Sequence, residues 1–367
     1  MVGGGTPDTT VKSYWGGDIQ WFTPSEIGKN KYVDFSKRTI TRDGLDNSSA
    51  KLLPLHTILL SSRATVGECS IASNECTTNQ GFQSLIAKQC NIDFLYYLIQ
   101  TKKKDLIRNA CGSTFLEISA NEIRKIKVAV PVQNEQEQIA KLLSLIDERI
   151  ATQNKIIEDL KKLKSAISQL LLFKSDLLEK RIPLSEVSAL KNGYPFLSSS
   201  YDSTGEYEVL TIANVTGERY ICSEGCNRIL TKPSDIQFHQ TLKANDILIS
   251  LTGNVGRVSL CKEGKYLLNQ RVGLLQLNSA IVREFIYQVL SSRDFEQSMI
   301  SCSQGAAQMN IGKGDVENYI IPYSGNPKNL LKISSALNSF DTKTLTESRI
   351  LQLLNRQKSH LLTSLFI

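Results

Sequence analysis

The sequence predicts an α+β protein made of two similar mixed α/β modules, with a long helix after each module. Three observations lead to this prediction. A set of short motifs occurs twice in the same order, each copy mixes strand-like and helix-like segments, and each copy ends in a long stretch of helical apolar periodicity. The expected segments are 1–130 for the first module, 131–180 for the first helix, 181–322 for the second module and 323–367 for the second helix.

The duplication is visible in short motifs about 190 residues apart, each copy keeping the residue types of the other. Two related modules on a spacer have the approximate two-fold character needed to contact two places on a regular polymer. The matching pairs are 58–61 with 247–250, 79–80 with 269–270, 94–96 with 285–287, 112 with 305, and 130–131 with 321–322.

Each module is expected to combine strands with one helix. In the first module, β-branched and aromatic runs between turn residues predict strands at 19–22, 57–61 and 125–130. Apolar residues at helical spacing predict a helix over 93–109. The second module opens with a segment that has no counterpart in the first, so the first copy is expected to lack an opening strand or helix.

The two long helices have apolar residues at about three of every seven positions, which predicts two antiparallel coiled-coil helices. A capping box at Asn134 and Glu137, and a cap at Asn326 before Pro327, predict where they begin. A helix of about 34 residues spans roughly 50 Å, more than one turn of B-form DNA at about 34 Å. The residues expected to pack are Ile139, Leu142, Ile146, Ile150, Ile157, Leu160, Leu163 and Ile167 in the first helix, and Ile333, Leu337, Phe340, Ile350, Leu354 and Leu361 in the second.

Composition limits the class of protein. The chain has 367 residues, enough for two domains with their own cores, and a formal charge of +7 that favours contact with a polyanion. No apolar run reaches the roughly 20 residues of a membrane span, so a cytoplasmic protein without membrane contact is expected. The eight cysteines show no metal-ligand spacing and are expected to be buried, reduced thiols, with no metal bound.

Motifs for catalysis are missing from the sequence. No glycine-rich loop of the ATP-binding type occurs, and no dinucleotide-binding glycine pattern follows a strand. The three histidines are scattered along the chain and are expected to be surface or cap residues. Catalysis by this chain alone is therefore not expected.

The repeated turns carry candidate DNA-contacting side chains. Guanidinium and amide groups match the edges of guanine and adenine, which makes polar turn residues after a strand suitable for reading bases. The alternative is that Asn79 and Asn269 only shape turns, and that Gly112 and Gly305 only end helices. The candidates are Ser62, Arg63, Thr65, Thr78, Asn79, Gln80, Ser113 and Thr114 in the first module, and Thr252, Asn254, Arg257, Asn269, Gln270, Arg271, Gln304 and Gln308 in the second.

Several motifs together resemble one protein family. They are Gly-Gly-Thr-Pro at 4–7, Tyr-Trp-Gly-Gly-Asp-Ile-Gln-Trp at 14–21, Arg-Ala-Thr-Val-Gly at 63–67, Thr-Asn-Gln-Gly-Phe at 78–82, and the entry into the first long helix at 131–139. With the duplication, they resemble the specificity subunit of type I restriction-modification systems over nearly the whole chain. The entry into the second helix departs from the pattern, because 322–327 lacks the Glu-Gln pair present at 135–138.

The resemblance implies a function and a set of partners. The modules are then target-recognition domains that each read half of a split double-stranded DNA sequence, while the helices set the gap and dock two methyltransferase subunits. Restriction subunits join through the complex. No cofactor is expected on this chain, whereas S-adenosylmethionine, ATP and Mg are expected on the partner subunits. The alternative from another class is a coiled-coil scaffold that dimerises two generic modules.

Overall fold

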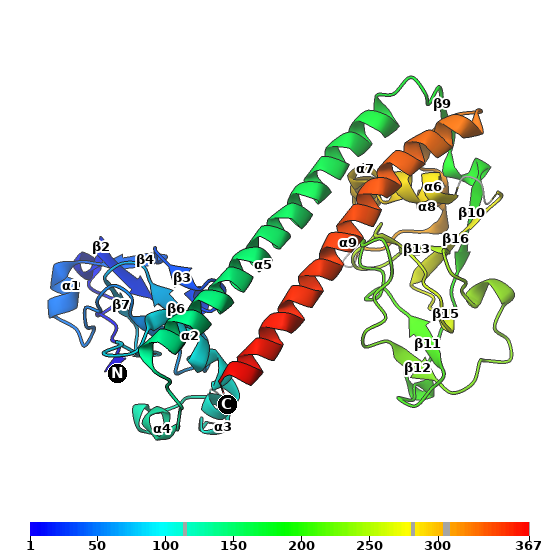
Figure 1. Cartoon of the computed structure of the whole chain (residues 1–367). Helices are drawn as coiled ribbons and strands as arrows, with labels where there is room; N and C mark the ends of the chain where they lie inside the picture. The colour runs from blue at the N-terminus through cyan, green and yellow to red at the C-terminus, as the bar shows by residue number, and fades with distance from the viewer. Residues whose placement is uncertain (113–115, 280–282, 304–308, 367) are drawn as a thin grey trace. The chain divides into compact units, whose positions relative to one another are not determined.

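The computed structural model describes residues 1–112, 116–279, 283–303 and 309–366. The chain divides into two compact units: unit 1 is Met1–Asn154 with Ile350–Ile367, and unit 2 is Lys155–Arg349. Helices α5 (Gln133–Ser168) and α9 (Pro327–Leu365) each contribute to both units, so each unit holds one module and part of both long helices (Figure 1). The expected segment boundaries near 130, 180 and 322 remain predictions.

The described strands of unit 1 form three small sheets, with strand orders β1-β8, β4-β2-β7 and β3-β6-β5. Strand β2 pairs antiparallel with β4 and parallel with β7, and all three residues of β5 are buried. The strands expected at 19–22 and 57–61 are therefore confirmed. In chain order they are β1 Val2–Gly3, β2 Trp15–Phe22, β3 Tyr32–Val33, β4 Arg38–Ile40, β5 Ile58–Leu60, β6 Cys69–Ala72, β7 Cys76–Thr78 and β8 Gln83–Ser84.

The helices of unit 1 are α1 (Arg42–Asp46), α2 (Ile92–Thr101), α3 (Lys103–Arg108) and α4 (Ala120–Lys125). The helix expected over 93–109 is present as two pieces, α2 and α3. They meet at Lys102, whose φ of −90° and ψ of 3° lie outside the helical range. The break separates the largely buried α2 from α3, in which Leu106 is buried.

The prediction of a strand at 125–130 is wrong. Residues 126–130 have no regular structure, and Val128 and Val130 are 46% and 51% exposed. The matching segment of unit 2 is strand β17 (Ile320–Tyr323), which pairs antiparallel with β9 (Lys180–Pro183). Among the described residues of unit 1, no strand lies opposite this segment, and a lone strand has no partner for its backbone N–H and C=O groups.

Unit 2 has larger sheets, with orders β10-β16-β13-β14, β12-β11-β15 and β17-β9 in the part that the structure describes. Helices α6 (Arg283–Leu290), α7 (Arg293–Cys302) and α8 (Lys313–Glu317) belong to the same unit. Its remaining strands are β10 Ser188–Asn192, β11 Tyr207–Leu210, β12 Asn227–Ile229, β13 Ile247–Ser250, β14 Val258–Leu260, β15 Tyr266–Leu268 and β16 Val272–Leu277.

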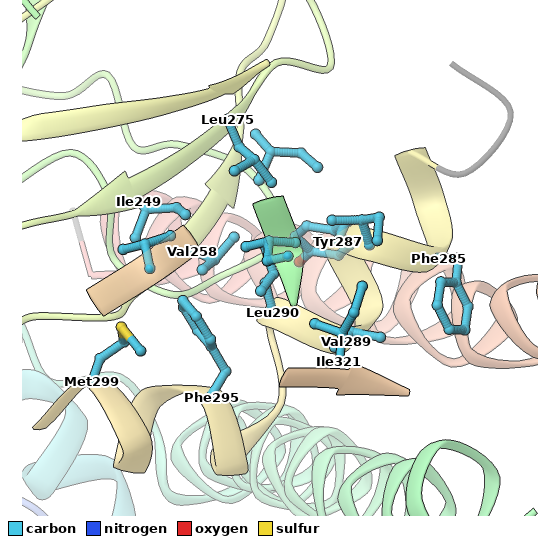
Figure 2. Close-up of a cluster of buried hydrophobic side chains, with 14 of the residues drawn as sticks. Ile249, Val258, Leu275, Phe285, Tyr287, Val289, Leu290, Phe295, Met299 and Ile321 are labelled. Atoms are coloured by element: carbon cyan, nitrogen blue, oxygen red, sulfur yellow. The ribbon is translucent and has the colours of Figure 1, made fainter. Parts of the chain in front are cut away.

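One buried cluster joins the sheet, the helices and α9 in unit 2. Figure 2 shows Ile249, Val258 and Leu275 of the sheet facing side chains of α6 and α7, with Phe295 among them. Leu337 of α9 belongs to the same cluster. Burying each such side chain stabilises the unit by about 1.5–3 kcal/mol, so the module and its part of α9 form one core.

Each unit also packs parts of the two long helices together. In unit 1, Ile139 and Leu143 near the start of α5 share a cluster with Leu361 near the end of α9. In unit 2, Ile167 near the end of α5 shares a cluster with Ile333 near the start of α9. Most of the expected packing residues are buried or half-buried: Ile139, Ile146, Ile150, Ile157, Leu160, Ile167, Ile333, Leu337, Phe340, Ile350, Leu354 and Leu361.

Two expected packing positions and one helix start need correction. Leu142 and Leu163 are 43% and 49% exposed, whereas Leu143 is fully buried. Leu143 belongs to the cluster that the first module forms with the start of α5, so packing against the module decides which face of the helix is buried here. Helix α5 begins at Gln133 rather than after a cap at Asn134.

The start of α9 is as expected. The Asn326 side chain accepts a hydrogen bond from the backbone N–H of Lys328 at 3.1 Å, and Pro327 is the first helical residue. Proline suits this position because its missing N–H would have no partner in the first turn. Within the described residues, no helix has both the length and the apolar composition that crossing a bilayer requires.

The cysteines are only partly as expected. Cys69, Cys76 and Cys261 are buried, and burial raises the pKa of each of these thiols to about 12. Cys111 and Cys302 are exposed, which corrects the expectation that all eight are buried. Cys302 is the last residue of α7, and Cys111 pairs with Glu117 in an isolated β-bridge.

Candidate nucleic-acid interface

The turns after β5 and β13 have the same backbone geometry. We call residues 61–67 turn 1 and residues 250–256 turn 2. In turn 1 the Gly67 N–H donates to the Ser61 carbonyl at 3.0 Å, and in turn 2 the Gly256 N–H donates to the Ser250 carbonyl at 2.9 Å. Both glycines have positive φ, +86° and +77°, a conformation that other residues adopt only with strain. The repeated Val-Gly therefore marks a required backbone shape.

A second segment runs beside each turn. The Ala64 N–H donates to the Leu116 carbonyl at 3.0 Å, and the Gly253 N–H donates to the Met309 carbonyl at 2.9 Å. Isolated β-bridges then pair residue 63 with residue 117 in unit 1 and residue 252 with residue 310 in unit 2. Each unit thus presents two short backbone segments side by side, held by matching hydrogen bonds.

The side chains on this shared scaffold differ between units. In unit 1, Arg63 Nη2 donates to both carboxylate oxygens of Glu117 at 2.8 and 2.9 Å. This hydrogen bond and the negative charge of Glu117 raise the pKa of Arg63. In unit 2, Thr252 Oγ1 donates instead to Asn310 Oδ1 at 3.1 Å. An exposed ion pair in one unit is a neutral hydrogen bond in the other.

The repeated asparagines shape turns, which was the alternative for both. Asn79 Oδ1 accepts from the Gly81 N–H at 2.9 Å, and Asn269 Oδ1 accepts from the Arg271 N–H at 3.2 Å. The same two-residue spacing in both units is typical of an Asx turn. These carboxamide oxygens have a structural partner in the protein itself.

Three candidates are too buried to face DNA. Ser62 and Thr78 are each 1% exposed, and Asn269 is 8% exposed. They stand where core strands end, so their side chains point into the module. Their expected role in reading bases is therefore corrected to a structural one.

The other candidates divide by exposure. Thr252 and Arg257 are half-buried, and Arg257 Nε lies 3.6 Å from Glu296. Thr65 shares a hydrogen bond with Ser61 at 3.0 Å. The exposed ones are Arg63, Thr65, Gln80, Asn254, Gln270 and Arg271. Ser113, Thr114, Gln304 and Gln308 lie outside the described residues.

Two residues of this surface were missed in the sequence. Glu117 and Asn310 stand opposite the turns, and each lies five positions after a repeated glycine, Gly112 or Gly305. The shared offset was the available signal. It was not used because the two residues differ in type, and a search for repeated identities passes over them.

In unit 2 the turn borders a cleft of about 400 Å³. Thr252, Gln270, Asn310 and Lys313 are among its lining residues and bring hydroxyl, carboxamide and ammonium groups to one place. Carboxamides match the donor and acceptor pattern of base edges, and an ammonium group attracts phosphate. The arrangement suits contact with a nucleic acid.

Comparisons with known proteins agree with this chemistry. The family model described as "Type I restriction modification DNA specificity domain" matches residues 2–162 and again residues 179–356. Each match contains one module and part of the long helix that follows it. The two matches cover most of the chain.

Curated relatives have the same description. The chain is 39% identical over 171 residues to the type I restriction enzyme MjaIX specificity subunit of Methanocaldococcus jannaschii, covering 44% of this chain and 39% of the relative. It is 23% identical over 378 residues to the EcoprrI specificity subunit of Escherichia coli, covering 93% and 85%. The matches to the first relatives, MjaIX and EcoR124I/EcoR124II of Escherichia coli, span 39% and 38% of the relatives' lengths.

Solved structures share the fold. A type I restriction-modification S subunit from M. genitalium matches with a TM-score of 0.58 at 17% identity, covering 99% of both chains. A chain from a study of assembly and conformational transition of the type I R-M system matches with a TM-score of 0.63 at 14% identity, covering 100% of this chain and 95% of that one.

Proposed function

The chain belongs to the type I restriction-modification DNA specificity family, and from this membership we propose that it is the DNA-recognition subunit of a type I restriction-modification complex. Each module reads one half of a split double-stranded DNA target. The formal charge of +7 favours association with this polyanion.

The observation that carries the proposal is the conserved backbone and divergent chemistry of turns 1 and 2. Phosphate contacts position a protein on DNA, whereas side chains at base edges specify sequence. A shared backbone supported by Gly67 and Gly256 places both turns alike. In unit 1 Arg63 bonds to Glu117, whereas in unit 2 Thr252 bonds to Asn310. The two modules therefore present different donors and acceptors, as two different half-sites require.

In this proposal the long helices set the gap between the two half-sites. The contacts within each unit, with the start of α5 against the end of α9 in one and the reverse in the other, support an antiparallel coiled-coil pair. Helix α5 has 36 residues and α9 has 39, so each extends over more than about 50 Å at 1.5 Å per residue. Rigid helices of this length hold two readers at a defined separation on DNA.

In this proposal the catalytic reactions are carried out by partner subunits. Two methyltransferase subunits dock on the helices and bind S-adenosylmethionine, and restriction subunits that use ATP and Mg join through the complex. The chain alone is then not an enzyme. A scaffold that only dimerises two generic modules would need no divergence between turns 1 and 2.

Selection from random duplex DNA tests the proposal. The chain, assembled with its methyltransferase partners, is incubated with a random library at about 150 mM salt, where non-specific phosphate contacts are weak. We expect a bipartite sequence with a constant gap. A single continuous motif, or enrichment without sequence preference, would overturn the proposal.

Turn variants assign the half-sites to the modules. Replacing Arg63 by Ala removes an exposed guanidinium and should relax the preference in one half-site only, by about 1–3 kcal/mol at the affected base pair. Replacing Thr252 by Ala is the matched change and should affect the other half-site only. An effect of either variant on both half-sites would contradict independent readers.

A matched insertion in both helices tests whether their length sets the gap between half-sites. Four residues inserted after Thr152 in α5 and four after Thr346 in α9 lengthen both helices by about 6 Å, close to two base pairs of B-form DNA. Both positions lie near the boundary between the units, so the packing inside each unit is kept. We expect the preferred gap to change while both half-site sequences stay the same. An unchanged gap would show that the helices do not set it.

A further inference from the structure

Each unit contains a charge network that joins the module to both long helices. Network 1 and network 2 consist of five residues each, and every member of one has a counterpart in the other. Network 1 is Lys31, Asp93, Tyr97, Asp147 and Lys358, and network 2 is Arg219, Glu284, Gln288, Asp341 and Lys164.

The two helix aspartates are held in the same way. Tyr97 of α2 donates to Asp147 Oδ2 at 2.7 Å, and Lys358 of α9 lies 2.6 Å from Asp147 Oδ1. In the other network, Gln288 of α6 donates to Asp341 Oδ2 at 2.7 Å, and Lys164 of α5 lies 2.6 Å from Asp341 Oδ1. One carboxylate oxygen therefore faces the module, and the other faces the opposite long helix.

The module cations are also equivalent, as their backbones show. The Lys31 carbonyl accepts from the Ile71 N–H at 2.7 Å, and the Arg219 carbonyl accepts from the Leu260 N–H at 2.8 Å. Lys31 Nζ lies 2.7 Å from Asp93 on α2, while Arg219 forms two bonds of 2.8 and 2.9 Å to Glu284 on α6. The same position thus carries a cation that pairs with an acid on the neighbouring helix.

The networks differ in how the cation reaches the long helix. Arg219 Nη1 also bonds directly to Asp341 at 2.9 Å, because a guanidinium can serve two carboxylates at once. Lys31 reaches α5 through Ser144 Oγ at 2.7 Å and does not bond to Asp147 in the described contacts. Beside network 1 is an open cleft of about 860 Å³ that Lys31, Asp147 and Lys358 help to line. Network 2 is therefore the stiffer connection.

Burial agrees with this ranking, because the Asp341 side chain is 11% exposed and the Asp147 side chain is 24% exposed. Burial by itself lowers the pKa of Arg219, but the bonds to Glu284 and the charge of Asp341 outweigh it, and the pKa is raised overall. The side chains of Arg219 and Asp341 are only 12% and 11% exposed. Removing one partner of such a pair leaves a charge buried without compensation, which costs far more than losing a surface pair.

We propose that these duplicated networks are positioning devices that fix the orientation of each recognition module on the helix pair and so set how strictly the gap between half-sites is measured. The inference rests on the proposed function. Apolar clusters alone allow small rotations at little cost because they are non-directional, whereas directed bonds to one carboxylate, two at Asp147 and three at Asp341, define a single orientation. A module free to tilt would accept half-sites at neighbouring separations.

The test measures affinity for duplexes in which both half-sites are constant and the gap varies by one base pair. For the wild-type complex we expect about tenfold weaker binding at a neighbouring gap, comparable with one mismatched base pair. Asp341→Asn keeps the size of the side chain and removes its charge, and should reduce this ratio to about threefold or less. The half-site sequences should not change.

Matched variants separate orientation from stability. Asp159→Asn makes the same substitution on the exposed face of α5 and should keep the wild-type ratio. Simple destabilisation lowers the folded fraction for every duplex alike and cannot alter a ratio between gaps. Tyr97→Phe removes one hydroxyl from network 1 and provides a milder variant, with a smaller loss of gap discrimination, should Asp341→Asn not fold.

A charge exchange completes the test. Asp147→Lys should weaken gap discrimination, and the double variant Asp147→Lys with Lys358→Asp should recover most of it because the pair is restored in reverse. Unchanged gap ratios in folded Asp341→Asn and Tyr97→Phe would overturn the inference while leaving bipartite recognition intact. Wild-type protein that selects no bipartite sequence at all would instead overturn the proposed function.

Discussion

The two units contain the same ion pair with opposite polarity. In unit 1 Glu68 pairs with Lys103 of α3, and at the matching place in unit 2 Arg257 lies 3.6 Å from Glu296 of α7. In each pair one residue directly follows the positive-φ glycine that ends the turn: Glu68 follows Gly67, and Arg257 follows Gly256. The position thus requires opposite charges but not a particular order of them.

This reversal separates what the scaffold needs from what each module can vary. A Cβ added at Gly67 would lie 2.8 Å from Lys103, and one at Gly256 would lie 2.7 Å from Met299, so in both units the turn touches the helix beside it. Close approach fixes the backbone, while the charges on it are free to change in pairs. The same rule describes Arg63 with Glu117 and Thr252 with Asn310.

The largest expected effect comes from a buried aromatic residue in the first turn of α2 and of α6. Phe94 and Phe285 are matched positions and are each 1% exposed. Replacing either by Ala should destabilise its own unit by about 3–5 kcal/mol through lost burial and a cavity. Hydrogen exchange should show lost protection in the mutated unit only. Equal loss in both units would mean that they unfold as one body.

The turn asparagines should have an intermediate effect that differs between units. Asn269→Ala should cost about 1–3 kcal/mol, because the Asn269 side chain is buried and its loss leaves a gap in the module as well as an Arg271 N–H without its partner. Asn79→Ala should cost less, since the Asn79 side chain is only half-buried and its loss leaves a smaller gap. Asp substitutions keep the acceptor oxygen and serve as controls in denaturant titrations. Equal costs for the two Ala variants would contradict the difference in burial.

Reversing one ion pair should have a smaller effect. Lys103→Glu places a second carboxylate beside Glu68 and should cost about 1 kcal/mol or less, because both side chains are well exposed. The double variant Glu68→Arg with Lys103→Glu copies the polarity of unit 2 and should recover that loss. A double-mutant cycle from thermal unfolding measures the coupling. A coupling of zero would show that the reversal reflects chance rather than pairing.

A pH-dependent effect is expected on the stability of unit 1. Burial by itself raises the pKa of Asp93, but hydrogen bonds from Lys31 and Tyr32 and the charge of Lys31 outweigh it, so its pKa is lowered overall. Its contribution is then present above the unfolded value of about 3.9 and is lost as the pH falls through the lower folded value. Asp93→Asn should reduce stability at pH 7 and converge with wild type in acid. A difference that persists unchanged at low pH would contradict the assignment.

Local patterns in the sequence were sufficient for the general plan. Repeated motifs revealed the duplicated module, and seven-residue periodicity located α5 and α9, because helical packing leaves a regular mark along the chain. The same patterns gave a wrong prediction where a strand needs a neighbouring strand to pair with. Residues 125–130 read as a strand, yet only the matching segment in unit 2 has β9 to pair with.

Which residues meet was decided by the tertiary structure. The aspartates of networks 1 and 2 are single polar residues in amphipathic helices, and their partners lie far away in sequence, so no local pattern marks them. Burial of Ser62 and Thr78 likewise depends on strands contributed from elsewhere. The order of residues along the chain determined two modules and two long helices, while folding determined which side chains are buried between a module and the helices and which remain on the surface.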